Sequence, residues 1–218
     1  MRRSIRVLLV GSTLALAIAM MSPSAYADAG LKLRPGSFGS GTEGAWQSKQ
    51  GLPDSKGNAR HALYLQKFTA TETVAAAYAV VDNLEGLAAD ELTDLSWEHR
   101  NDGWCGAGAP RWNIVVQGEP AEPYTLFLGC AAATHTFPHP GWTKDSYTGD
   151  DILEIGAANS GNGDNLADIQ AGTIVALYIL FDEGTTLNGL PYGPGFVYLD
   201  NITVNDKVFT GPMDNGKH

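Results

Sequence analysis

The 218-residue chain has few basic residues: 14 Lys and Arg stand against 24 Asp and Glu, a net charge of −10. Binding to nucleic acid depends on Lys and Arg side chains that neutralise phosphates, so the composition excludes nucleic acid as an expected partner. An acidic protein is also repelled by anionic membrane surfaces. Three of the basic residues, Arg2, Arg3 and Arg6, stand at the start, so a chain that lost this segment would be more acidic still.

Long apolar runs are also scarce. The longest, VLLVGSTLALAIAMM at residues 7–21, is shorter than the roughly 20 residues that a membrane-spanning helix needs. It follows the basic residues and precedes Ala25-Tyr26-Ala27, which matches the small-x-small pattern of a signal-peptide cleavage site. We therefore predict a signal peptide over residues 1–27, no membrane span, and a secreted, extracellular protein made of residues 28–218.

The chain has only two cysteines, Cys105 and Cys130. An even number of cysteines in an exported protein indicates a disulfide, and we predict that these two form one. Two free thiols or two metal ligands are the alternative. No further Cys or His stands at the spacing of a metal motif from either residue, which favours the disulfide.

Catalytic motifs are absent from the sequence. It contains no G-x-S-x-G nucleophile motif. Asp151 and Glu154 in DDILEIG come nearest to a glycosidase carboxylate pair, but a spacing of three places them on opposite faces of the strand expected there. His135 and His139 have a spacing that binds metal on a helix, yet the prolines at 138 and 140 exclude a helix. We predict no catalytic residues.

The chain is rich in short strand-like segments separated by turns, with 26 Gly and 11 Pro. Leu95 and Trp97 alternate with polar residues, as in a strand with one buried face. One short helical turn is expected at residues 166–170. This pattern favours a single all-β sandwich or barrel with frayed ends. Strands are expected at residues 61–68, 74–81, 92–100, 111–116, 124–129, 173–182 and 196–204.

Several motifs succeed one another in an order typical of a known group. A turn contains Cys105-Gly106, the segments GAPRWNIVV and FLGC follow, and the last strand reads GFVYLDNITVN. With Trp142 in a loop between them, residues 36–210 resemble secreted bacterial jelly-roll proteins, whose architecture is shared with carbohydrate-binding modules. The resemblance implies a single jelly-roll β-sandwich. It concerns the fold, which does not determine function.

Asp200 and Asn201 interrupt the last strand, although both residue types are depleted in strands. In jelly-roll carbohydrate-binding modules an Asp in the last strand often ligates a structural Ca²⁺. The resemblance therefore implies a Ca²⁺ site at Asp200, completed by backbone carbonyls and by an acid near the first strand, for which Glu43 is the candidate. The alternative is an acid that is hydrogen-bonded at a strand end or bulge without metal.

Two tryptophans are candidates for ligand binding. Trp104 and Trp142 lie in loops rich in glycine or proline. Loop aromatics on a rigid β scaffold can present flat faces to sugar rings. The alternative is that these rings cover the ends of the sandwich.

Polar residues of two central strands form a second group of candidates. They face, by strand parity, away from the side that carries the strands' tryptophans. They could line a binding cleft on the concave sheet, or they could form a network of arginines and carboxylates on a solvated sheet. The group consists of Glu98, Arg100, Arg111 and Asn113.

The expected function is noncatalytic binding outside the cell, with a polysaccharide or cell-surface glycan as partner. The alternative is an extracellular structural or protein-interaction domain without a small ligand. A third hypothesis is a glycoside-cleaving enzyme on the same fold. The sequence does not indicate an oligomeric state.

Overall fold

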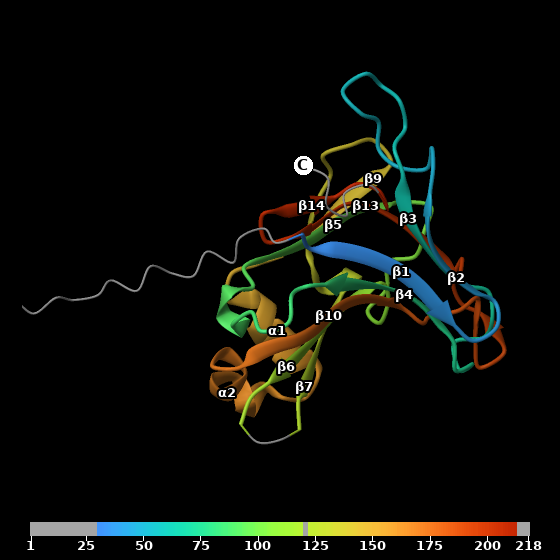
Figure 1. The fold of residues 1–218 in the computed structure, drawn as a ribbon. Coiled ribbons are helices and arrows are strands. Elements are labelled where there is room, and N and C mark those ends of the chain that lie inside the picture. The colour runs from blue at the N-terminus through green and yellow to red at the C-terminus, as the bar shows by residue number, and fades with distance from the viewer. Residues whose placement is uncertain (1–29, 120–121, 213–218) are drawn as a thin grey trace, which may run out of the picture.

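The computed structural model describes residues 30–119 and 122–212. The predicted signal peptide and the last six residues lie outside this range. The described chain forms two antiparallel sheets that face each other, so the predicted all-β sandwich is confirmed (Figure 1). Neither helix of the described residues combines the length and the apolar character needed to cross a bilayer.

The smaller sheet has five strands in the order β1-β4-β10-β6-β7. Its central strand, β10, is made of the apolar run TIVALYILF, as expected for a strand with neighbours on both sides and a covered inner face. The strands are β1 (Lys32–Phe38), β4 (Ala76–Asp82), β10 (Thr173–Phe181), β6 (Arg111–Gln117) and β7 (Tyr124–Gly129).

The larger sheet has seven strands in the order β2-β3-β13-β5-β9-β8, with β14 paired to the second half of β13. A separate small hairpin joins β11 and β12. The strands are β2 (Thr42–Gln47), β3 (Ala62–Lys67), β13 (Phe196–Val204), β5 (Asp94–Arg100), β9 (Trp142–Thr148), β8 (Thr134–Thr136), β14 (Lys207–Phe209), β11 (Thr186–Leu187) and β12 (Leu190–Pro191).

The chain passes repeatedly from one sheet to the other: β3, β4, β5 and β6 alternate between them, which gives the jelly-roll connections. The core lies between the sheets. Trp97 of β5 and Trp112 of β6 stack there with ring centroids 5.2 Å apart, and both side chains are buried. This contact shows that the alternate residues of these two strands face inward, as the sequence pattern predicts.

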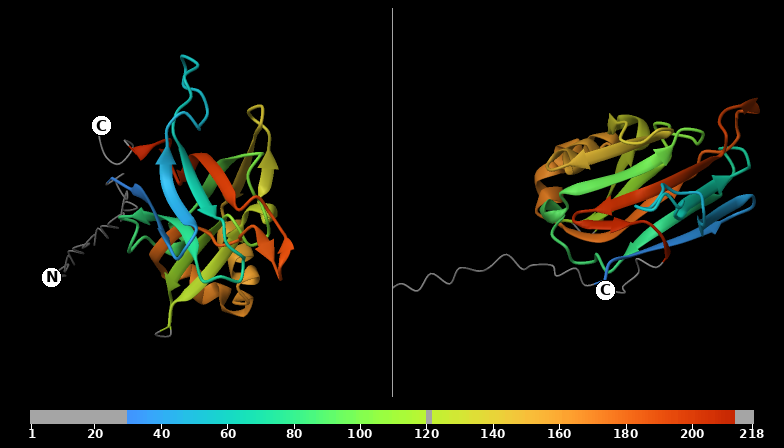
Figure 2. Two further views of the ribbon diagram at one scale, coloured as in Figure 1. Left: turned by 90° about the vertical axis from the view of Figure 1, so that its right-hand side faces the viewer. Right: turned by 90° about the horizontal axis from the view of Figure 1, so that it is seen from above.

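Two helices gather at one end of the sandwich (Figure 2). The predicted helical turn is confirmed as α2 (Leu166–Gln170). The strand expected around Asp151 and Glu154 is wrong, because this segment is helix α1 (Asp151–Asn159). Its buried positions, 152, 153, 156 and 157, recur with the period of a helix. Gly156 brings α1 close to Leu126 of β7, where an added Cβ would lie 3.0 Å from the leucine side chain.

The predicted disulfide between Cys105 and Cys130 is confirmed, and the described residues contain no free cysteine. It joins the loop before β6 to the residue that follows β7. Since Cys130 is fully buried and belongs to the main core, the bond ties an outer loop to the interior.

Candidate functional site

Two hollows on the outer face of the five-stranded sheet meet at Arg111 and Gly108. One has a volume of about 450 Å³, and its lining includes Phe127 and Asn159. The other, of about 420 Å³, is lined by Asp182, Glu183 and the loop at residues 71–75 among others. Because they share residues, the hollows form one continuous open surface, which is the candidate functional site.

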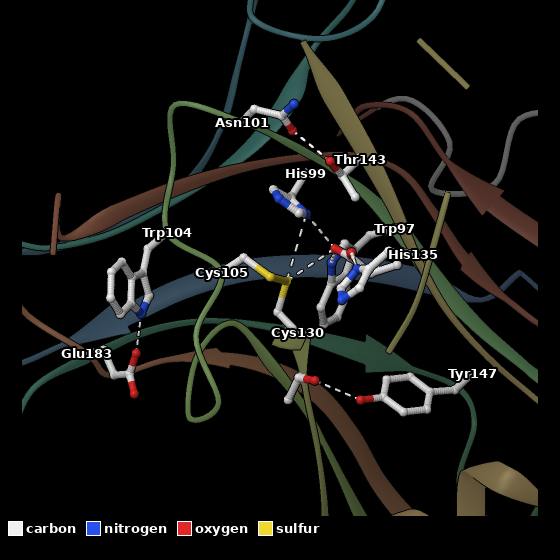
Figure 3. Close-up of a disulfide and its surroundings, with 12 residues drawn as sticks. Trp97, His99, Asn101, Trp104, Cys105, Cys130, His135, Thr143, Tyr147 and Glu183 are labelled. Carbon is white, nitrogen blue, oxygen red and sulfur yellow. Dashed lines mark hydrogen bonds and ion pairs between the residues drawn. A yellow bond between two sulfur atoms is a disulfide. The ribbon is translucent and has the colours of Figure 1, made fainter. Parts of the chain in front are cut away.

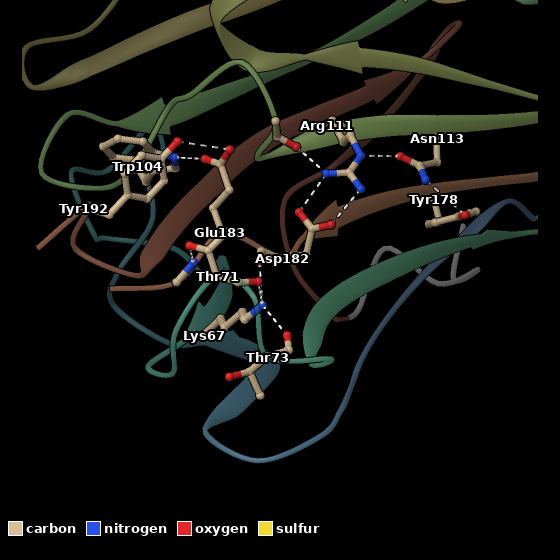
Figure 4. A network of polar contacts seen from close by, with 12 residues as sticks. Lys67, Thr71, Thr73, Trp104, Arg111, Asn113, Tyr178, Asp182, Glu183 and Tyr192 are labelled. Atoms are coloured by element: carbon tan, nitrogen blue, oxygen red, sulfur yellow. Dashed lines mark hydrogen bonds and ion pairs between the residues drawn. The ribbon is translucent and has the colours of Figure 1, made fainter. Parts of the chain in front are cut away.

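Arg111 lies at the centre of this surface, at the start of β6 (Figure 4). Its Nη1 and Nη2 each donate to one carboxylate oxygen of Asp182 at 2.7 Å, and Nη1 also donates to the carbonyl of Gly108. Nε donates to Asn113 Oδ1 at 3.0 Å, and the amide of Asn113 donates to the Tyr178 hydroxyl at 3.1 Å. Such a fork-to-fork pair fixes the guanidinium in one orientation.

Lys67 is a buried residue in the lining of the same surface. Its side chain is 1% exposed, and Nζ donates to the carbonyl oxygens of Thr71, Thr73 and Asp182 at 2.7–2.9 Å. Burial lowers the pKa of Lys67, although the Asp182 carboxylate opposes that shift. The ammonium group thus joins the loop after β3 to the end of β10. It also fixes the backbone of Asp182, whose carboxylate holds Arg111.

Trp104 lies beside the surface and is half-buried. Its indole N–H donates to Glu183, which lines the hollow, and the ring lies 5.0 Å from that of Tyr192 (Figure 4). Gly193 allows this approach, since a Cβ there would lie 2.8 Å from the indole. Tyr192 keeps 37% of its surface exposed, so part of this residue is open to a ligand.

The four polar candidates do not share a face. The stacked pair Trp97 and Trp112 lies between the sheets, so the outward residues of β5 and β6 point to opposite sides of the molecule. Arg111 and Asn113 belong to the surface described above, whereas Glu98 and Arg100 lie on the outside of the seven-stranded sheet. The prediction that all four residues line one cleft or form one network is therefore wrong.

Glu98 and Arg100 are held by their own partners. Glu98 accepts hydrogen bonds from His139 Nδ1 at 2.6 Å and from the Asn201 amide at 2.7 Å, and it is buried. Arg100 pairs with Asp102 at 2.7 Å and lies over the ring of Tyr198, with 3.8 Å from its carbon to the ring centroid. The two sets of contacts share no residue, so Glu98 and Arg100 are each held separately on that sheet.

Trp142 was expected in an exposed loop, but it is the first residue of β9 and is 8% exposed. It belongs to a small apolar cluster with Leu52 and Ala62, against which Tyr198 packs. The segment that carries Leu52 folds over the outside of the seven-stranded sheet and covers the indole. Its flat face is therefore not available to a sugar ring.

Asp200 is fully buried in β13 beneath the same segment. Oδ2 accepts from the Leu52 N–H and Oδ1 from the Asn201 N–H, both at 2.7 Å, and Arg60 lies 3.8 Å from Oδ2. Burial raises the pKa of Asp200 to about 6. The pairing of β13 with β5 shifts register between Asp200 and Thr203, so the acid stands at a bulge.

The geometry does not fit the expected calcium pair. Glu43 is opposite Gln66, and Gln66 is opposite Phe196. Glu43 therefore lies two strands across from β13 and four residues along from Asp200, roughly 13 Å in the strand direction alone. Both Asp200 oxygens already accept backbone N–H groups, which matches the metal-free alternative. Calcium binding at Asp200 can be tested by a thermal melt with and without a chelator.

The residues that sequence reasoning missed are Lys67, Asp182 and Glu183. Each stands at or just beyond the end of an apolar strand, the one signal that could have drawn attention to them. Their convergence with Arg111 depends on the pairing of β10 with β6 and on the packing of the loop after β3. Neither can be derived from local pattern.

No protein-family model matches the chain, and none of the curated proteins compared with it matches either. Among solved structures it is similar to a family 30 carbohydrate-binding module of a cellulosomal cellulase from Clostridium thermocellum. The identity is 14% and the TM-score 0.41, over 81% of this chain and 94% of that one. These values are too low to carry an argument about function.

Proposed function

We propose that the protein is a noncatalytic carbohydrate-binding domain that acts outside the cell and binds a polysaccharide across the surface around Arg111. The observation that carries the proposal is the continuous hollow itself. It combines fixed hydrogen-bonding groups, Arg111 and Asp182, with the ring of Phe127 in its lining. The disulfide supports an oxidising, extracellular location.

A sugar chain presents apolar ring faces and a rim of hydroxyl groups, and the surface has groups for both. Phe127 is half-buried and its centroid lies 5.6 Å from the Arg111 guanidinium, so aromatic and polar contacts can reach the same ring. Tyr192 and Trp104 extend the aromatic part beyond Glu183. Since Arg111 is held before binding, little side-chain freedom is lost when a ligand binds.

The partners of the charged groups favour binding over catalysis. The carboxylates of Asp182 and Glu183 both accept hydrogen bonds from side chains. Asp151 and Glu154 lie exposed on α1, and neither lines the two hollows. Glycoside cleavage therefore has no observation in its favour among the described residues.

Affinity electrophoresis and calorimetry with a panel of soluble polysaccharides test the proposal. For a polysaccharide that binds, Phe127→Ala and Tyr192→Ala should each weaken binding by about tenfold or more, since buried aromatic contacts dominate such interfaces. Phe137→Ala is the matched control, because this ring is 76% exposed and precedes β9 in the other sheet. Unchanged binding by both site variants, or loss in the control alone, contradicts the proposal.

The second candidate function is binding to another protein, which one observation favours. Phe38 and Val74 line the same hollow and are 50% and 87% exposed, so two apolar side chains are open to a protein partner there. A double change of these two residues to Ser distinguishes the functions. It should abolish association if the partner is a protein, whereas Phe127→Ala should weaken binding if the ligand is a polysaccharide.

A further inference from the structure

A second cluster of reactive side chains surrounds the disulfide, on the inner side of the seven-stranded sheet (Figure 3). His99, Cys105, Cys130 and Asp145 each offer one ligand atom, and these atoms all lie within 4.8 Å of one another. Asp145 is 1% exposed and Cys130 is fully buried. None of these residues lines the hollows around Arg111.

The strand pairing explains why these residues meet. In β9 Asp145 stands opposite Trp97 of β5, and both face the core, which places His99 of β5 diagonally beside Asp145. His99 Nδ1 lies 2.5 Å and Cys130 Sγ 3.2 Å from Asp145 Oδ2, and Sγ lies 3.8 Å from His99 Nδ1. The Cα atoms of Cys105 and Cys130 are 5.3 Å apart.

We propose that the dithiol form of this protein binds one Zn²⁺ between Cys105, Cys130, His99 and Asp145. Every newly made chain passes through the dithiol form before its disulfide is made. Two thiolates, an imidazole and a carboxylate are a ligand set that zinc takes in tetrahedral sites. Oxidation of the thiols removes two of the four ligands, so disulfide formation and zinc binding exclude each other.

The distances among His99 Nδ1, Cys130 Sγ and Asp145 Oδ2 are close to those that the ion requires. With zinc–ligand distances of about 2.0–2.3 Å, ligand atoms of a tetrahedral site lie roughly 3.3–3.8 Å apart. Two of the separations given above already lie within a tenth or so of an ångström of this range. His99 and Asp145 must separate by somewhat less than 1 Å, and the two sulfur atoms part when their bond is reduced.

Outer contacts needed to hold the carboxylate are also present. The indole N–H of Trp97 donates to Asp145 Oδ2 at 2.7 Å, and His135 Nδ1 lies 2.7 Å from Oδ1. Metal-ligating carboxylates are usually held by such partners. The His135 side chain is 36% exposed, so the cluster has one member at the surface through which an ion can enter.

A phosphine can reduce the disulfide between Cys105 and Cys130 to the two thiols that bind zinc. Its phosphorus takes an oxygen atom from water and becomes a phosphine oxide, while the two electrons break the disulfide and the two protons of water complete two thiols. Zn²⁺ binding then releases about two protons as both thiols become thiolates. Reoxidation by a small disulfide forms the bond between Cys105 and Cys130 again, reduces the small disulfide to two thiols with two protons from the solvent, and frees the ion.

The experiment reduces the purified protein anaerobically with a water-soluble phosphine and titrates it with Co²⁺ and then Zn²⁺. One equivalent of Co²⁺ should give thiolate charge-transfer and tetrahedral absorption bands, which Zn²⁺ abolishes as it displaces the probe. A pH indicator should register about two protons released per Zn²⁺. The oxidised protein should show none of these signals.

Two variants distinguish zinc binding at this site from nonspecific binding of the ion to the two thiols. Asp145→Asn should weaken zinc binding at least tenfold, whereas His139→Ala, an exposed histidine bound to Glu98, should leave it unchanged. If the reduced protein unfolds, one equivalent of Zn²⁺ should restore its circular dichroism. The absence of tetrahedral bands, a failure to restore folding, or equal affinity in the Asp145→Asn variant would overturn the proposal.

Discussion

The buried carboxyl group of Asp200 leads to a pH dependence of stability that can be measured directly. Burial raises its pKa from the ordinary value of 3.8 to about 6. The N–H groups of Asn201 and Leu52 and the Arg60 guanidinium oppose this shift, but burial outweighs them. Between the two pKa values the folded protein holds a proton on Asp200 that the unfolded chain has released.

The sign follows from this difference in bound protons. Because the folded state binds the additional proton, the free energy of unfolding falls as the pH rises from about 4 to about 6. One pKa unit corresponds to about 1.4 kcal/mol. The stability linked to Asp200 is therefore about 3 kcal/mol, present in full below pH ~4 and lost above pH ~6.

Urea denaturation of the parent protein and of Asp200→Asn across pH 3.5–7.5 measures this contribution. The amide does not titrate, so the difference in unfolding free energy between the two proteins cancels the effect of all other groups. That difference should move by about 3 kcal/mol in favour of the variant as the pH rises. A difference that stays constant across this range refutes the reasoning.

Asp54 provides the control for this measurement, since it lies in the segment that covers Asp200. Its carboxylate accepts hydrogen bonds from the backbone N–H groups of Asn58 and Lys56, which lower its pKa. A lowered pKa makes the linked stability rise with pH, the reverse of Asp200. The difference for Asp54→Asn should therefore be small and opposite in sign.

Three further predictions concern other parts of the molecule. Removal of divalent cations with a chelator should leave the melting temperature unchanged, because Asp200 is satisfied by N–H groups; a fall of several degrees in a thermal melt would revive the calcium site. Lys67→Met leaves three carbonyl groups without their donor and should lower the unfolding free energy by about 3 kcal/mol or more in urea. Trp142→Ala should cost about 3 kcal/mol in the same assay, whereas the exposed Tyr192→Ala should cost less than about 1 kcal/mol; equal costs would show that the two rings are similarly buried.

The strands could be predicted because their signal is local. Alternation in β5 and β6 placed Trp97 and Trp112 on inner faces, where they stack. The cysteine pair could be predicted from number alone. Helix α1 was missed because DDILEIG is too short to distinguish the period of a helix from that of a strand, and two of its residues are β-branched. The better signal was the helical spacing of Ile152, Leu153, Gly156 and Ala157, which together form its buried face.

The candidate site could be predicted only in part, because it depends on which strands become neighbours. The alternation of side chains along a strand correctly predicted that Glu98 and Arg111 face outward. It could not show that their strands belong to opposite sheets. The burial of Trp142 depends on a segment ninety residues earlier that carries Leu52. His99 and Asp145 meet through the register of β5 and β9, so no spacing motif reveals the cluster at the disulfide.

The strand order has a consequence for the growing chain on the ribosome. The strands β3 and β5 are separated by β13, and β4 and β6 by β10, so the middle of each sheet is made after the strands that flank it. About 130 residues separate the end of β3 from the start of β13, which at 5–20 residues per second takes roughly 6–26 seconds to synthesise. During that interval the flanking strands expose unpaired backbone edges, which are templates for aggregation. Nascent chains should therefore depend on holding chaperones until residue 204 has emerged.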